Sequence, residues 1–195
     1  MTLQQFINKY DIPKAIVLLE GKRVVLESDQ PLLTALGKLL ATKTQHIIFR
    51  SGNAKGADEF FCKGVAEVNN ERLQAITPYT NHRHKENKAF LTIGLDTINL
   101  AEEPAILEAT KTNKKASSLA DAYMKGYKGL IAIKAALLIR DTVKVTGTKD
   151  LPPATFAIFY DDLLKPKTGG TGHTMEVCNF KNVPYINQQV WMDWL

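Results

Sequence analysis

The sequence predicts an α/β fold, a Rossmann-like doubly wound and mainly parallel sheet flanked by helices. Short apolar runs alternate with stretches of helical periodicity, as in consecutive strand-helix-strand units. Two of these runs lead into glycine-rich segments that open a helix, the arrangement found where parallel strands end. A chain of 195 residues, 45% of them hydrophobic, can enclose one sizeable core, so we expect a single domain over residues 1–195.

The first elements are a short amphipathic helix and a buried strand. Leu3, Phe6 and Ile7 have helical spacing and Pro13 ends the helix, which we interpret as an extension over residues 1–13. Residues 15–19 are all apolar, as in a strand buried on both faces. A crossover helix with an early proline follows over residues 29–40.

The alternation continues in the middle of the chain and is then interrupted. Residues 46–50 predict a second strand, the following glycine-rich segment opens a helix through residue 68, and residues 74–78 predict a third strand. Residues 79–115 have less regular apolar spacing, and we interpret them as an insertion, either a lid over the ligand or a surface excursion. Residues 117–140 predict a long helix that its two glycines bend or split.

The alternation resumes near the C-terminus. The run 154–160 predicts a strand, a helix is expected from Met175 to Phe180, and residues 183–186 predict a short strand that Pro184 restricts to an edge or to its own first residues. Trp191 and Trp194 are expected to pack against the domain or against a partner subunit.

Composition narrows the class of protein. The net charge of +5 comes from scattered basic residues and favours an anionic ligand only weakly, with nucleic acid the less favoured partner. Cys62 and Cys178 lack CxxC spacing, which disfavours a disulfide framework or a zinc site. No apolar run is long enough for a membrane span and the N-terminus lacks signal-peptide character, so we expect a cytoplasmic protein without a membrane partner.

The first glycine-rich segment follows the second predicted strand. Free backbone N–H groups and the helix dipole meet where such a loop enters a helix, so it can bind an anion. Gly52 and Gly56 allow close approach, Lys55 can reach an oxyanion, and Asp58 either caps the helix or holds a ribose hydroxyl. A purely structural turn capped by Asp58 is the alternative. The candidate ligand residues here are Ser51, Gly52, Asn53, Lys55, Gly56 and Asp58.

The second glycine-rich segment follows the strand at residues 154–160. Two such loops at the carboxyl ends of parallel strands converge on one crevice, which makes the pair a stronger signal than either loop; the alternative is a flexible glycine hairpin. Neither loop has the Gly-Lys-Ser/Thr ending of a P-loop, and the first strand lacks GxGxxG, so ATP hydrolysis and ordinary NAD chemistry lose support and no cofactor is expected. The candidate ligand residues here are Gly169, Gly170, Thr171, Gly172, His173 and Thr174.

These two segments resemble the glycine loops of the SLOG superfamily, which includes the DprA/Smf proteins and the lonely-guy phosphoribohydrolases. Residues 51–58 are similar to its SGGARGAD-type loop, and residues 169–176 to its GGTxHT or GGxGTxxE-type loop. Gly21, Lys22 and Arg23 are similar to the Gly-Ser/Thr-Arg that follows the first strand in many members, and the resemblance implies that they too contact the ligand. The resemblance covers roughly residues 14–186 and implies a Rossmann-like fold that binds a nucleotide.

The lonely-guy enzymes cleave the bond between base and ribose 5'-monophosphate with a glutamate that pairs with an upstream arginine. The resemblance places Glu176 and Arg140 at those positions. Thr168 replaces the proline of the motif, His173 replaces its threonine, and Arg140 lacks the adjacent lysine. The resemblance therefore implies ligand binding more directly than catalysis.

The histidines offer little independent chemistry. His173 could hydrogen-bond a phosphate, carry a proton or act as a capping residue. His82 and His84 lack further ligands at a suitable spacing, so no metal site is expected.

Three functions follow in order of preference. The first is binding of a nucleotide or nucleotide-derived phosphate ligand, with a sensor as one form of this function. The second is a nucleoside 5'-monophosphate phosphoribohydrolase (an N-glycosidase) that uses Glu176 and Arg140. The third is single-stranded DNA binding, which rests on fold-level kinship and a modest positive charge. A homo-oligomer is compatible with each of them.

Overall fold

The apolar run at residues 15–19 forms the central strand β1 (Ile16–Gly21) of one six-stranded sheet. The structure, a computed structural model, describes residues 1–195. Every strand pairing is parallel and the order is β4-β3-β2-β1-β5-β6, which is a doubly wound α/β fold, as predicted. The other strands are β2 (Ile48–Ser51), β3 (Leu73–Thr77), β4 (Leu91–Gly94), β5 (Phe156–Tyr160) and β6 (Tyr185–Ile186).

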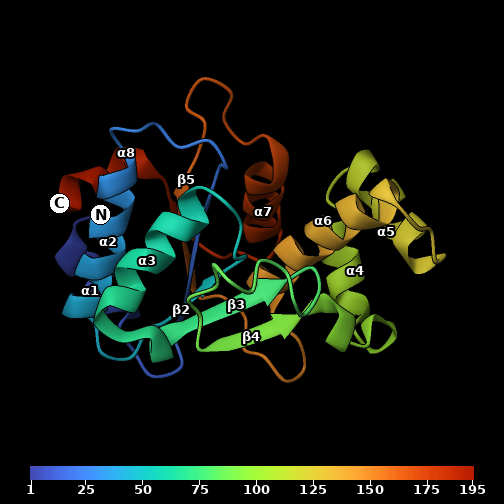
Figure 1. Ribbon diagram of the computed structural model, residues 1–195, viewed down its shortest axis with the longest axis horizontal. Coiled ribbons are helices and arrows are strands. Elements are labelled where there is room, and N and C mark those ends of the chain that lie inside the picture. Colours follow the sequence, from blue (N-terminus) through green and yellow to red (C-terminus); the bar gives the residue numbers. More distant parts are fainter.

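Helices cover both faces of this sheet because alternate strand residues point to opposite sides. Val17 and Leu19 pack in a core with one set of helices, whereas Leu18 packs with the other. The first set, grouped around the two termini in Figure 1, is α1 (Leu3–Tyr10), α2 (Gln30–Lys43), α3 (Ala57–Asn69) and α8 (Gln188–Trp191). The second set is α4 (Pro104–Thr110), α5 (Lys114–Met124), α6 (Leu130–Thr146) and α7 (Gly169–Phe180).

Residues 79–115, predicted as an insertion, contribute directly to the sheet. They contain the edge strand β4, which pairs with β3 through Gln74 to Thr77, and the helix α4, whose Ile106 joins a buried cluster with α6. Short exposed runs such as 91–94 give little strand signal, because only one edge of β4 is paired and its side chains are half-buried.

The predicted long helix over residues 117–140 is divided into α5 and α6. Gly126 and Gly129 both have positive φ, at 76° and 70°, so the backbone turns between the helices at the two glycines. The two helices pack against each other at one end of the molecule, beside α4 (Figure 1). This confirms a split rather than a bend.

The C-terminal segment closes the first core. Trp191 is fully buried and donates its indole N–H to Phe159 O at 2.9 Å, and Trp194 donates to Met1 O at 3.1 Å. Both tryptophans therefore pack within this chain, and the two termini lie side by side. Cys178 is buried, Cys62 is partly buried, and both thiols are free. None of the helices combines the length and the apolar character needed to cross a bilayer.

Candidate functional site

The strand order places a topological switch point between β1 and β5. The chain leaves β1 toward β2, β3 and β4 on one side, and returns through β5 and β6 on the other. Crossover connections diverge at such a point, so a crevice opens beyond the carboxyl ends of the two strands. Gly21 ends β1 and Tyr160 ends β5, and these two residues are paired in register.

A cavity of about 660 Å³ occupies this crevice, a volume within the range of ordinary small-molecule sites. Its walls come from the ends of β1 and β5, the loop after β2, helices α5 and α6, and the start of α7. The residues are Glu20, Gly21, Lys22, Arg23, Ala54, Asp58, Asn113, Lys115, Ala116, Leu119, Lys134, Leu137, Leu138, Arg140, Asp141, Asp161, Asp162, Lys167, Thr168, Gly169, Gly170, Thr171, His173 and Glu176.

The rim of the cavity is basic. Six basic and six acidic side chains line the cavity, but four of the acidic ones are almost completely buried in its walls. Five basic side chains reach solvent at the rim, whereas only two acidic side chains, Asp162 and Glu176, do so. The basic ones are Lys22, Arg23, Lys115, Lys134 and Lys167. This distribution attracts an anion to the mouth of the cavity.

The second glycine-rich segment is the start of a helix and not a loop. We predicted a helix from Met175, but α7 begins at Gly169, and Thr168 is its N-cap. Helix propensity misplaces this boundary because glycine is a poor helix former in the interior, whereas the first turn tolerates it. Gly172 is required by packing, since a Cβ there would lie 2.0 Å from Lys167 O.

The N-terminus of α7 presents unused hydrogen-bond donors to the cavity. The Thr168 side chain makes no cap bond; its hydroxyl donates to Lys165 O instead. Gly172 N–H bonds to Thr168 O, which leaves the N–H groups of Gly169, Gly170 and Thr171 without a protein acceptor. Three free amides at the positive end of a helix are able to bind an anion.

The first glycine-rich segment is largely satisfied from within. The Asp58 carboxylate, 1% exposed, accepts the N–H of Gly21 at 3.2 Å, of Gly52 at 3.0 Å and of Ala54 at 3.4 Å, as well as the Ser51 hydroxyl at 3.1 Å. Asp58 thus fills the place that a bound anion would take, and it ties this loop to the end of β1.

Only part of the predicted ligand set reaches the cavity. Gly21, Lys22, Arg23 and Asp58 line it, and so do Gly169, Gly170, Thr171 and His173. The remaining predicted residues lie behind its wall or beside it. They are Ser51, Gly52, Asn53, Lys55, Gly56, Gly172 and Thr174. A Cβ on Gly52 would overlap the Arg140 guanidinium, so Gly52 serves the close approach of Arg140.

A buried ionic cluster supports the floor of the cavity. Lys144 Nζ lies 2.6 Å from Glu20 Oε2 and 2.8 Å from Asp141 Oδ1, and Arg140 Nε lies 2.9 Å from the same Asp141 oxygen. The two contacts to Asp141 Oδ1 are close enough for an ion pair, although that oxygen accepts no well-aligned hydrogen bond. Arg140 also donates to Gly52 O at 2.5 Å. This cluster fixes α6 against the sheet.

The cluster contains more acid than base. Glu20, Asp141 and the neighbouring Asp58 face only two cations, Arg140 and Lys144. Burial, together with Asp141 and Asp58, outweighs Lys144 and raises the pKa of Glu20 from 4.5 to about 8. Arg140 and Lys144 lower the pKa of Asp141 against the opposing effect of its burial. Of the three acids, Glu20 is therefore the one whose protonated form its surroundings favour.

Replacement of Glu20 with glutamine is expected to remove a pH dependence of stability. The folded protein binds a proton at Glu20 more tightly than the unfolded chain between pH 4.5 and about 8, so stability falls as pH rises through that window. The glutamine amide can donate to Thr174 Oγ1, whose hydroxyl can turn to Gly170 O. Urea denaturation of both proteins on either side of the window checks this. Equal slopes in the two proteins would contradict it.

Glu176 and Arg140 both line the cavity but do not pair with each other. Arg140 is 5% exposed, and its guanidinium is held by Asp141 and Gly52. Glu176 is exposed, and its Oε2 accepts the Thr112 hydroxyl at 2.8 Å and the Asn113 amide at 2.9 Å. Glu176 Oε1 makes no hydrogen bond with the protein. A carboxylate with one oxygen anchored and one free can act on a bound ligand.

Several site residues were missed by sequence reasoning. Glu20 ends an apolar strand, and Asp141 and Lys144 are three residues apart in an apolar helix, so a charge inside a buried stretch was the available signal. Thr112 and Asn113 lie in the segment that we interpreted as an insertion. Their role depends on contacts with α7 that only the fold creates.

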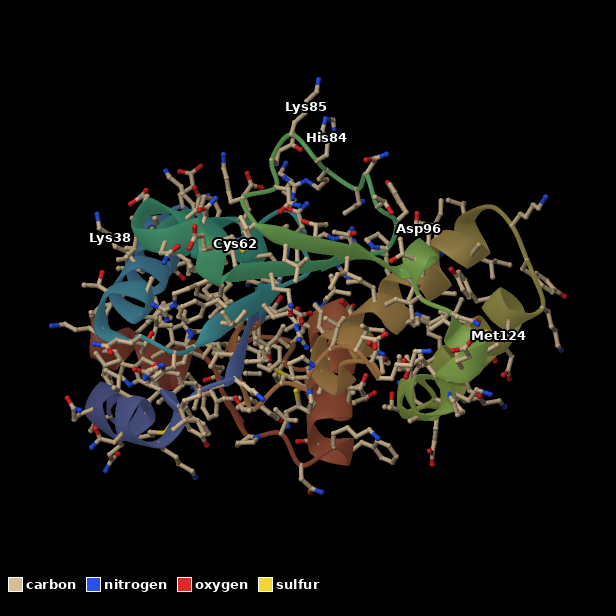
Figure 2. The ribbon with its side chains drawn as sticks, turned by 90° about the horizontal axis from the view of Figure 1, so that it is seen from below. Lys38, Cys62, His84, Lys85, Asp96 and Met124 are labelled. Atoms are coloured by element: carbon tan, nitrogen blue, oxygen red, sulfur yellow. The ribbon has the colours of Figure 1, made fainter.

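The other histidines and Tyr160 lie outside the chemistry of the cavity. His84 and Lys85 point away from the body of the molecule (Figure 2), and no group of three His, Cys, Asp or Glu side chains could hold a metal ion. Tyr160 is 1% exposed and its hydroxyl donates to Asp29 at 2.6 Å, so it packs and does not present its ring for stacking.

Comparisons with known proteins add little to this geometry. No family model matches the chain, and no curated protein matches it in sequence. Among solved structures the chain is similar to DNA processing protein A from Helicobacter pylori, a single-stranded DNA binding protein. The sequence identity is 13% and the TM-score 0.47, over 92% of this chain and 67% of that one.

Proposed function

We propose that the cavity at the switch point binds a nucleotide or nucleotide-derived ligand through its phosphate. The observation that carries this proposal is the N-terminus of α7, where three backbone N–H groups without acceptors meet a basic rim. The resemblance of residues 169–176 to the SLOG glycine motif agrees with it.

The apolar part of the cavity suits the rest of such a ligand. Ala116 and Leu119 of α5 face the cavity together with Leu137 and Leu138 of α6. A base or a sugar can pack on these aliphatic side chains while the phosphate lies at α7. Both ends are present in one cavity, which supports a nucleotide over inorganic phosphate alone.

The Thr168→Asp variant tests the phosphate site. An aspartate at the N-cap accepts the N–H groups of Gly170 or Thr171, so it stabilises α7 by about 1 kcal/mol and occupies the anion site with its own carboxylate. We expect affinity for nucleoside 5'-monophosphates, measured by calorimetry, to fall at least about tenfold, or about 1.4 kcal/mol, while thermal stability is kept or raised.

Thr168→Asn is the matched control for this experiment. Asparagine caps the helix without a negative charge, so it should weaken binding less than aspartate does. Unchanged affinity in Thr168→Asp would reject the α7 site. Retention of a single-stranded oligonucleotide at low salt, with no binding of mononucleotides, would assign the basic rim to nucleic acid instead.

A second candidate function is hydrolysis of the bond between base and ribose in a nucleoside 5'-monophosphate. The observation that favours it is Glu176, with one oxygen held by Thr112 and Asn113 and the other free at the cavity. Helical rise places Glu176 about 10 Å along α7 from the free amides, which is comparable with the extent of a ribose phosphate and its base. A carboxylate there could stabilise positive charge at the ribose or activate water.

A further inference from the structure

A continuous chain of side-chain hydrogen bonds joins α4 and α6 to Glu176 on α7. Thr110 Oγ1 lies 2.9 Å from Thr142 Oγ1, and Thr142 Oγ1 lies 3.2 Å from His173 Nε2. His173 Nδ1 is 3.4 Å from Thr112 Oγ1, which lies 2.8 Å from Glu176 Oε2. The chain runs from the interior to the cavity, because Thr110 and Thr142 are fully buried.

Counting protons gives this chain a direction. A carboxylate only accepts, so the single Thr112 hydroxyl proton is donated to Glu176. Thr112 Oγ1 is then free to accept from His173, whose Nδ1 lies 3.4 Å away, and this hydrogen bond needs a proton on Nδ1. Nε2 is left as an acceptor for the Thr142 hydroxyl, and Thr110 can donate to Thr142. In this arrangement each of the three threonine hydroxyls and the imidazole N–H donates one hydrogen bond.

The neutral state of the imidazole is consistent with this direction. Burial lowers the pKa of His173 from its usual value, although Asp141, Glu176 and a hydrogen bond with the backbone of Leu138 oppose the effect. Lys144 also lowers the pKa of His173. His173 is 5% exposed, so its two nitrogens depend on Thr112, Thr142 and the backbone of Leu138 for partners.

We propose that His173 is a positioning residue, which as the neutral Nδ1–H tautomer orients Thr112 so that the Thr112 hydroxyl holds Glu176 Oε2. Asn113, the N-cap of α5, supplies the second donor to that oxygen, and Glu176 Oε1 stays free toward the cavity. His173 then contacts neither phosphate nor base. The tautomer is a property of the ligand-free chain, and only its catalytic consequence rests on the proposed function.

Nitrogen-15 NMR of the whole protein reads this tautomer directly. At neutral pH we expect His173 to carry its proton on Nδ1, with the signal identified by its loss in His173→Asn. In Thr112→Val, Nδ1 loses its acceptor, whereas Nε2–H can donate to Thr142 Oγ1, whose own hydroxyl can turn to Leu138 O, 3.2 Å away. We therefore expect His173 to change to the Nε2–H tautomer in that variant.

Thr112→Ser is the matched control, because it keeps the hydroxyl and should keep the Nδ1–H tautomer. An Nε2–H or doubly protonated His173 in the unaltered protein would overturn the proposal. So would an Nδ1–H tautomer that persists in Thr112→Val. Neither outcome depends on whether a ligand is known, so failure of the proposed function leaves this test intact.

If the protein releases free base, kinetic measurements test separately whether His173 and Thr112 position Glu176 for catalysis. Loss of the contact in Thr112→Val should lower kcat by about 10- to 100-fold with little change in KM, because Glu176 is misplaced while the α7 phosphate site is unaltered. His173→Asn, whose amide N–H can replace Nδ1–H, should recover more activity than His173→Leu. Equal activity in these two variants would overturn the positioning role.

Discussion

Replacement of Lys144 with methionine is expected to lower the free energy of unfolding by about 3–5 kcal/mol. Lys144 is fully buried and lies 2.6 Å from Glu20 and 2.8 Å from Asp141. Methionine fills a similar volume, so the loss comes from the charge and not from a cavity. Asp141, which is 3% exposed, is left with Arg140 as its only Lys or Arg partner.

Equilibrium urea denaturation measures this loss. Lys149→Met is the control, because Lys149 forms its ion pair with Glu102 at the exposed surface and should leave the midpoint nearly unchanged. A variant that fails to fold agrees with the expectation only if Lys149→Met folds normally. A Lys144→Met midpoint equal to that of the unaltered protein would show that the cluster contributes no net stability.

Replacement of Glu176 with alanine is expected to reduce base release from a nucleoside 5'-monophosphate by about 10²- to 10⁴-fold, the contribution typical of a positioned acid or base. The side chain is exposed and contacts only Thr112 and Asn113, so the fold should tolerate the change. Affinity for the nucleotide should fall much less, because the phosphate site lies at the other end of the cavity.

Release of free base, measured by chromatography, decides between the two proposed functions. Glu71→Gln serves as the control, since Glu71 lies beside the start of β3, at the opposite edge of the sheet from the cavity. If the unaltered protein binds nucleotides and releases no base, the phosphoribohydrolase hypothesis is rejected and the binding function alone remains. Release that survives in Glu176→Ala would assign the chemistry to another group.

The local residue pattern was sufficient to predict five of the six strands and the helices α1, α2 and α3. The runs at 15–19, 46–50, 74–78 and 154–160 are apolar because the central parallel strands are covered on both faces, so each is visible without its neighbours. Two of them lead into glycine-rich segments, and this placed the candidate site at the carboxyl edge of the sheet, where the cavity lies.

Only the tertiary structure decided how the two glycine-rich segments differ. In sequence both are strands followed by glycines and a helix, but Asp58 consumes the amides of the first, whereas those of α7 remain free. The cluster around Lys144 and the chain through His173 also join residues more than 60 positions apart, such as Thr112 and Glu176. Such contacts depend on which faces meet across the sheet, and periodicity does not carry that information.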